Sequence, residues 1–119
     1  MKTTDLIGTA LDWAVAKCMG GIWEDGSMPF WPIWPDTNTK SSPSTDWAQG
    51  GPIIERECIC TYASGGGAVR PKKPTHWVAE ILEVDGIRDE QGPTPLVAAM
   101  RVFVASRLGD EIDLPEELK

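Results

Sequence analysis

Two stretches of the chain place apolar residues at the three- and four-residue spacing of an amphipathic helix. The first stretch predicts a helix over Thr4–Met19, capped by Thr3 or Thr4 and ended by a pair of glycines. Its apolar arc is wide, so we expect most of this helix to be covered. Trp13 should be buried against the sheet, whereas Asp12 should face away. The apolar positions are Ile7, Leu11, Ala14 and Cys18, with Leu6, Ala10 and Trp13 beside them.

The second stretch predicts a helix over Pro95–Leu108. Thr94 is a good N-cap, a proline follows it at the first helical position, and Gly109 is a stop signal. Met100 lies in the middle of the apolar stripe and should be buried, whereas Arg101 lies off the stripe. The other residues of the stripe are Leu96, Phe103 and Val104.

Between the helices, alternating residues predict two strands, Ile53–Tyr62 and Trp77–Leu82. Strands enclosed by two terminal helices favour a layered arrangement over a parallel α/β fold. We therefore expect one α+β domain over residues 1–119, in which two helices pack on a small, mainly antiparallel sheet.

The stretch Pro43–Glu57 concentrates a hydroxyl pair, a carboxylate, an indole, an amide and two glycines. We interpret it as a shaped loop that leads into the first strand and forms one wall of a pocket for a small polar ligand. In the alternative, the carboxylate caps a turn, the indole fills the core and the arginines pair with nearby acids. The candidate ligand-binding residues are Ser44, Thr45, Asp46, Trp47, Gln49, Gly50, Gly51, Arg56 and Arg101.

Two further segments have compositions that suggest a role without fixing it. Trp23–Trp34 mixes aromatic residues with prolines, which excludes a regular helix, and it either covers the core or lines a groove. The Gly65–Lys73 loop carries Arg70, Lys72 and Lys73 near its end. This loop is either an exposed connector or a basic clamp that closes over a ligand.

Length and charge limit the classes of function. The 119 residues suffice for one domain with a modest core, since 41% of them are hydrophobic. The net charge of −7 argues against general binding to nucleic-acid phosphates. No apolar run approaches the roughly 18 to 20 residues that span a bilayer, and the N-terminus lacks the order of a signal peptide. We therefore expect a cytoplasmic protein that does not contact a membrane.

The chain lacks the usual combinations of catalytic or metal-binding residues. Three cysteines predict free thiols, and we interpret Cys58 and Cys60 as small buried side chains on one strand face. The one histidine, His76, has no obvious nucleophile beside it, and no Cys/His spacing fits a metal site. We therefore expect no catalytic residue, no metal and no cofactor, in a protein that is not an enzyme.

Three motifs together resemble the NinX-like family, which consists of small proteins of tailed phages and prophages. They are Leu11–Cys18 (LDWAVAKC), Pro43–Glu57 (PSTDWAQGGPIIERE) and Gly92–Arg101 (GPTPLVAAMR). The resemblance implies a phage origin, a non-essential accessory role and action in the cytoplasm of the host cell. It implies no established reaction and no catalytic residues.

Two hypotheses of function follow, and both remain open from the sequence. In the first, the protein binds a small anionic, nucleotide-like ligand without turnover and so sequesters a host immune signal. In the second, exposed aromatic residues and acidic charge dock the protein on a host protein and inhibit it. In either case the chain could form a homo-oligomer.

Overall fold

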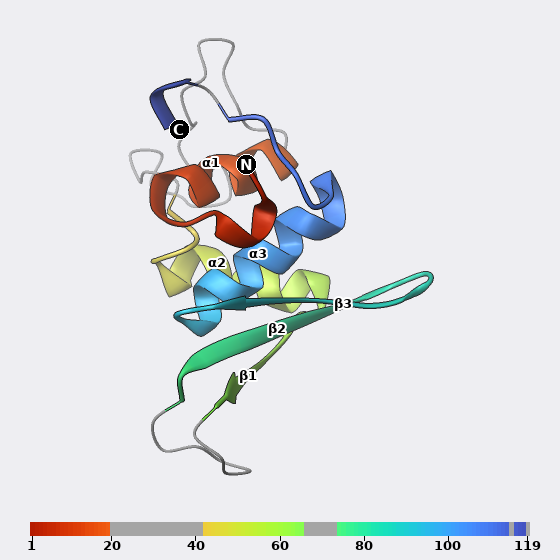
Figure 1. The fold of residues 1–119 in the computed structure, drawn as a ribbon. Helices are drawn as coiled ribbons and strands as arrows, with labels where there is room; N and C mark the ends of the chain where they lie inside the picture. Colours follow the sequence, from red (N-terminus) through yellow and green to blue (C-terminus); the bar gives the residue numbers. More distant parts are fainter. Residues whose placement is uncertain (20–41, 66–73, 115, 119) are drawn as a thin grey trace.

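The fold is α+β, as predicted, with α helices packed on one antiparallel sheet (Figure 1). The computed structural model describes residues 1–19, 42–65, 74–114 and 116–118. The Trp23–Trp34 segment and residues 66–73 of the basic loop lie outside the described residues. No helix among the described residues is long and apolar enough to cross a membrane. In chain order the elements are η1 (Thr3–Asp5), α1 (Gly8–Cys18), α2 (Trp47–Glu57), β1 (Cys60–Ser64), β2 (His76–Glu83), β3 (Gly86–Gly92), α3 (Pro95–Leu108) and η2 (Glu116–Leu118).

Helix α3 lies at the centre of the molecule, between the sheet and α1 (Figure 1). The predicted bounds of this helix are confirmed. Thr94 Oγ1 accepts a hydrogen bond from Val97 N–H at 3.1 Å, and Gly109 ends the helix with a φ of 86°. Met100 is completely buried, as predicted. The other buried residues of α3 are Leu96, Val97, Ala98, Ala99, Val102, Phe103, Val104 and Ala105.

The sheet has the order β1-β2-β3, and both pairs of neighbours are antiparallel. The α helices lie on one side of it, as Figure 1 shows. Ala79 and Ile81 of β2 are buried with the core residues. The directly paired residues Leu82 and Ile87 belong to the opposite face and are largely exposed. The face that no described helix covers therefore carries exposed apolar side chains.

The predicted strand Ile53–Tyr62 is wrong in its first half, because residues up to Glu57 form the end of α2. The glycines and Pro52 disfavour a helix locally, and Pro52 lacks the N–H that would bond to the carbonyl of Ala48. Tertiary packing nevertheless selects a helix. A side chain at Gly50 would come within 2.4 Å of the Leu96 side chain, so glycine here lets α2 approach α3 closely.

The first predicted helix begins later than expected. Thr3–Asp5 is a separate 3-10 turn, and α1 starts only at Gly8, whose φ of 58° interrupts a continuous helix. Thr3 caps nothing in this region; its buried hydroxyl donates to the carbonyl of Gly109 at 2.7 Å. Trp13 is buried as predicted, but not against the sheet, because α1 packs on the side of α3 away from the sheet. Asp12, which was expected to face away, is only 6% exposed.

The sequence did not predict β3, and it misplaced two cysteines. β3 holds the polar run Arg88–Gln91, which shows no alternation of apolar and polar residues. Cys58 and Cys60 are both exposed instead of buried. Cys58 ends α2 with a left-handed φ of 55°, so the two thiols do not share the face of one strand.

We expect Met100→Ala to lower the free energy of unfolding by about 2–5 kcal/mol, because it leaves a cavity between α3 and its neighbours. Urea denaturation followed by tryptophan fluorescence measures this loss. Leu82→Ala is a matched control, since the side chain of Leu82 is 80% exposed and its removal should change stability by less than about 0.5 kcal/mol. Equal effects of the two substitutions would contradict the assignment of the core.

Candidate functional site

The residues around the start of α2 form a compact polar cluster. The N–H of Ser44 donates to Asp12 Oδ1 at 2.8 Å, and this hydrogen bond is buried. Asp46 is the N-cap of α2, and its Oδ1 accepts from Ala48 N–H at 2.9 Å. Gln49 is buried, accepts from Ser42 N–H at 2.7 Å and donates to Asp46 Oδ2 at 3.3 Å. The cluster therefore fastens the start of α2 to α1.

This arrangement matches part of the structural alternative for the Pro43–Glu57 motif. The carboxylate of Asp46 caps a helix, and the N–H of Gly50 bonds to the carbonyl of Asp46 at 2.9 Å. Two carboxylates, Asp12 and Asp46, lie near the first turn of α2, where the helix dipole would otherwise attract an anion. These groups disfavour a phosphate at this helix start.

The other predicted site residues lie apart from this cluster or on its exposed side. Trp47 is 55% exposed, so its indole does not fill the core. Thr45 is exposed too, and Gly51 is half-buried, with open space where a side chain would be. Arg56 lies ten residues beyond Asp46, about 15 Å along the helix axis.

Neither predicted arginine lies with the motif's polar cluster. Arg56 Nη2 donates to the sulfur of Met19 at 3.0 Å, and Arg56 Nε lies 3.8 Å from Glu57 Oε2. Arg101 donates to the carbonyls of Leu6 and Gln91, each at 2.7 Å, and so ties α3 to the N-terminal segment and β3. Burial lowers the pKa of Arg101 below its ordinary value. The structure thus brings together Ser44, Asp46, Gln49 and Gly50, but not the two arginines.

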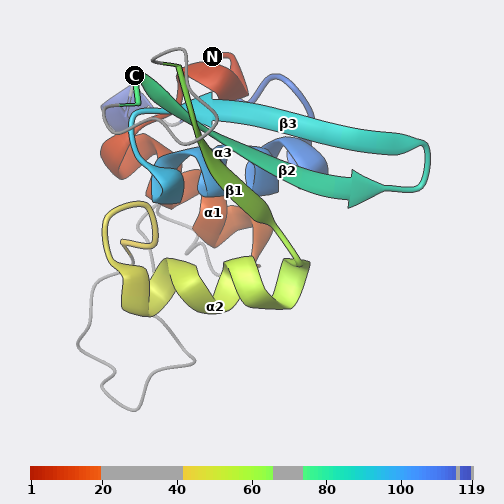
Figure 2. The same ribbon diagram turned by 90° about the horizontal axis from the view of Figure 1, so that it is seen from below.

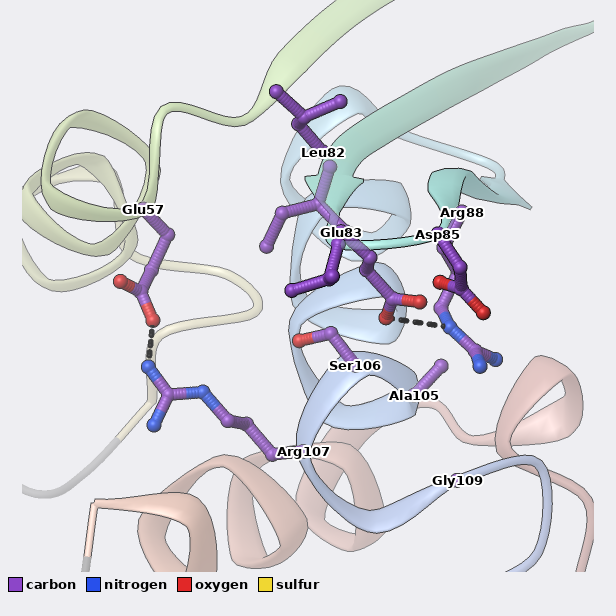
Figure 3. A pocket seen from close by; sticks show the side chains of 11 residues that line it. Glu57, Leu82, Glu83, Asp85, Arg88, Ala105, Ser106, Arg107 and Gly109 are labelled. Carbon is purple, nitrogen blue, oxygen red and sulfur yellow. Dashed lines mark hydrogen bonds and ion pairs between the residues drawn. The ribbon is translucent and has the colours of Figure 1, made fainter.

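A groove lies elsewhere in the molecule, between the C-terminal ends of α2 and α3 and the end of β2 (Figure 3). This groove has a volume of about 620 Å³. The ion pair Glu57–Arg107 stands on one side of it, and Glu83–Arg88, with a nitrogen–oxygen distance of 2.9 Å, stands on the other. Arg88 also pairs with Asp110 at 2.8 Å, which fastens the hairpin to the segment after α3.

The β2–β3 hairpin beside this groove reaches beyond the helices (Figures 1 and 2). Its end carries exposed aliphatic side chains: Leu82 is 80% exposed, Ile87 is 67% exposed and Val84 is fully exposed. Leu82 and Ile87 are directly opposite each other in the antiparallel register, so their side chains share one face. We call Leu82, Val84 and Ile87, with the acids Asp85 and Asp89, the hairpin surface.

The electrostatics of the hairpin are strongly acidic. Residues 76–92 contain five carboxylates and a single arginine. That arginine, Arg88, is paired with two acids, and its hydrogen bond to Glu83 raises its pKa. Burial raises the pKa of Glu90, which lies on the same strand. The described residues contain no group of three or more His, Cys, Asp or Glu side chains that could hold a metal ion.

A comparison with known protein families shows to which family the chain belongs. The model of the family described as "Bacteriophage P22, NinX" matches residues 2–107. The chain belongs to this NinX family. The resemblance inferred from the three motifs is therefore confirmed. A search of curated proteins found no match.

Sequence reasoning missed the hairpin surface of this NinX-family chain. A usable signal was present, because an Asp-Gly pair such as Asp85-Gly86 favours a hairpin turn. In the structure the two turn residues are Val84 and Asp85, and Gly86 begins β3 with a φ of 140°. A hairpin here would have placed Leu82, Val84 and Ile87 at one end of the sheet.

We expect Asp12→Ala to lower the free energy of unfolding by about 1–3 kcal/mol, because the N–H of Ser44 would remain buried without its acceptor. Asp12→Asn keeps a carbonyl acceptor and should be less destabilising. Urea denaturation compares both variants with Thr9→Ala, which alters an exposed residue of the same helix. If Asp12→Ala were no more destabilising than Thr9→Ala, Asp12 would not anchor the motif.

Proposed function

We propose that this chain is a non-enzymatic phage accessory protein that acts in the host cytoplasm by docking on another protein through the hairpin surface. The observation that carries the proposal is the exposure of Leu82, Val84 and Ile87 at the end of a projecting hairpin. Exposed apolar groups gathered at one place with a polar rim are typical of interaction sites.

The energy available from this surface suits a specific complex. Full burial of one aliphatic side chain yields about 1.5–3 kcal/mol. A few such anchors commonly dominate the energy of an interface, while the surrounding polar residues exclude water. Arg88, held by Glu83 and Asp110, stiffens the base of the hairpin, so less conformational entropy is lost on binding.

The negative charge of the hairpin surface and of the whole protein indicates the kind of partner. Asp85 and Asp89 lie beside the apolar residues, and the protein as a whole carries a net charge of −7. A partner with an apolar pocket rimmed by lysine or arginine would complement this surface and would be attracted over distance. A second copy of the chain would instead bring acid against acid at this surface. We therefore assign the hairpin surface to a different, basic host protein.

Binding of a nucleotide-like ligand at the Pro43–Glu57 motif is the second candidate. The exposed indole of Trp47 supports it, because a base could stack there. Against it stand the two carboxylates near the helix start and the separation of Arg56 and Arg101 from the motif. The basic loop, residues 70–73, lies outside the described residues and adds no support.

Substitutions in the hairpin should separate these two functions. We expect Leu82→Ser/Ile87→Ser, and separately Asp85→Lys/Asp89→Lys, to weaken binding to a host protein captured by the wild type by at least tenfold, which is about 1.4 kcal/mol. Trp47→Ala should leave that binding unchanged. Capture from host lysate identifies the protein, and calorimetry with the purified partner measures the affinity of each variant and its dependence on salt.

The same calorimeter tests the second candidate with linear, cyclic and ADP-ribose-derived nucleotides. Binding of a nucleotide that Trp47→Ala abolishes, together with no partner sensitive to the hairpin substitutions, would replace docking by ligand sequestration. Partner affinities that are equal for the wild type and both hairpin variants would also contradict the docking proposal.

A further inference from the structure

Strand β1 forms one edge of the sheet, and within the described residues it has none of the features that protect an edge. Its sequence, Cys60–Ser64, contains no charged residue and no proline. Natural proteins usually block an exposed edge with lysine, proline, a bulge or a covering segment, because its backbone groups can pair with another strand. In the part of the chain that the structure describes, no strand pairs with the outer edge of β1.

The opposite edge of the same sheet is protected in the usual ways. Strand β3 carries the consecutive charged residues Arg88, Asp89 and Glu90. The side chain of Glu90 is hydrogen-bonded to Thr4, and Arg101 donates to the carbonyl of Gln91. Of the two edges of the sheet, β1 is therefore the one that is suited to pairing with another strand.

The exposed side chain at the middle of β1 is also held in place. Tyr62 is 46% exposed, and its hydroxyl donates to Glu80 Oε1 on the neighbouring strand at 3.0 Å. A fixed aromatic side chain loses little conformational entropy when it becomes covered, and aromatic residues paired across strands stabilise a sheet.

We propose that β1 pairs antiparallel with β1 of a second copy of this chain, about a twofold axis at Tyr62, to form a continuous six-stranded sheet. In this register Tyr62 faces Tyr62 of the second copy, and Cys60 faces Ser64 of the second copy. No charged residue of either edge meets a like charge, in contrast to self-association through the acidic hairpin surface.

The second copy is the favoured occupant because the edge is complementary to itself. A symmetric contact uses the same patch on both copies, and an uncharged strand has no charge pattern that would select a foreign strand. Five paired residues make a small interface, so the dimer should form reversibly as concentration rises. Such a dimer would carry two hairpin surfaces, although the pairing itself does not depend on the docking proposal.

Charges placed at the facing positions test this register. In Cys60→Lys/Ser64→Lys, each lysine faces a lysine of the second copy, and we expect the dissociation constant of the dimer to rise about tenfold. In Cys60→Lys/Ser64→Glu, each lysine faces a glutamate, and dimerisation should return at least to the wild-type level. Sedimentation velocity over a wide range of protein concentration measures association, and circular dichroism confirms that each variant is folded.

Three results would overturn the proposal. The wild type could remain monomeric at every concentration, or the two double variants could associate equally. A wild-type chain that binds a synthetic peptide with the β1 sequence but does not associate with itself would show that the edge accepts a foreign strand instead.

The docking proposal is tested separately. Cys60→Lys/Ser64→Lys should still bind the basic partner, because its hairpin surface is unchanged.

Discussion

The burial of α3 is the constraint on which the rest of the fold depends. The sheet packs on one side of this helix, and α1 and α2 pack on others, so each element is positioned by its contact with α3. The close approach of these elements to α3 requires small residues at the points of contact. A side chain at Gly92 would come within 2.7 Å of the Ala98 nitrogen, and one at Gly50 would strike Leu96. Gly50 and Gly92 are therefore explained by packing without invoking a phosphate, whereas nothing in the structure explains Gly51, which has open space where a side chain would be.

The buried carboxylate of Asp12 links α1 to the segment that precedes α2. Asp12 is removed from water within α1, and a buried hydrogen bond from the backbone of Ser44 offsets part of the cost of burying its carboxylate. That bond fixes the chain just before α2, and Asp46 then caps the helix. The most distinctive motif of the sequence is therefore largely used to build the fold. Leu82, Val84 and Ile87 at the end of the hairpin are, by contrast, exposed and have no role in the core.

Local signals decided how much of the fold could be predicted. Helix α3 was predicted with its correct bounds because its cap, its first proline, its apolar spacing and its terminal glycine all agree. Helix α2 was missed because two glycines and Pro52 oppose a helix locally, and only contact with α3 overcomes them. β3 was missed because its run Arg88–Gln91 is polar on both faces. For the site, the sequence identified residues that do lie together, such as Asp46 and Gln49, but it could not show that Arg101 points to Leu6 and Gln91.

The central claim is that the Pro43–Glu57 motif is an anchored part of the fold while the hairpin end is a free surface. Amide hydrogen exchange measured residue by residue by NMR tests this claim most directly. The account predicts that the amide of Ser44 exchanges only through global unfolding, as slowly as the buried amides of α3, whereas the amides at Val84 and Asp85 exchange rapidly. Rapid exchange at Ser44, while α3 remains protected, would show that the motif is a mobile loop and would contradict the account.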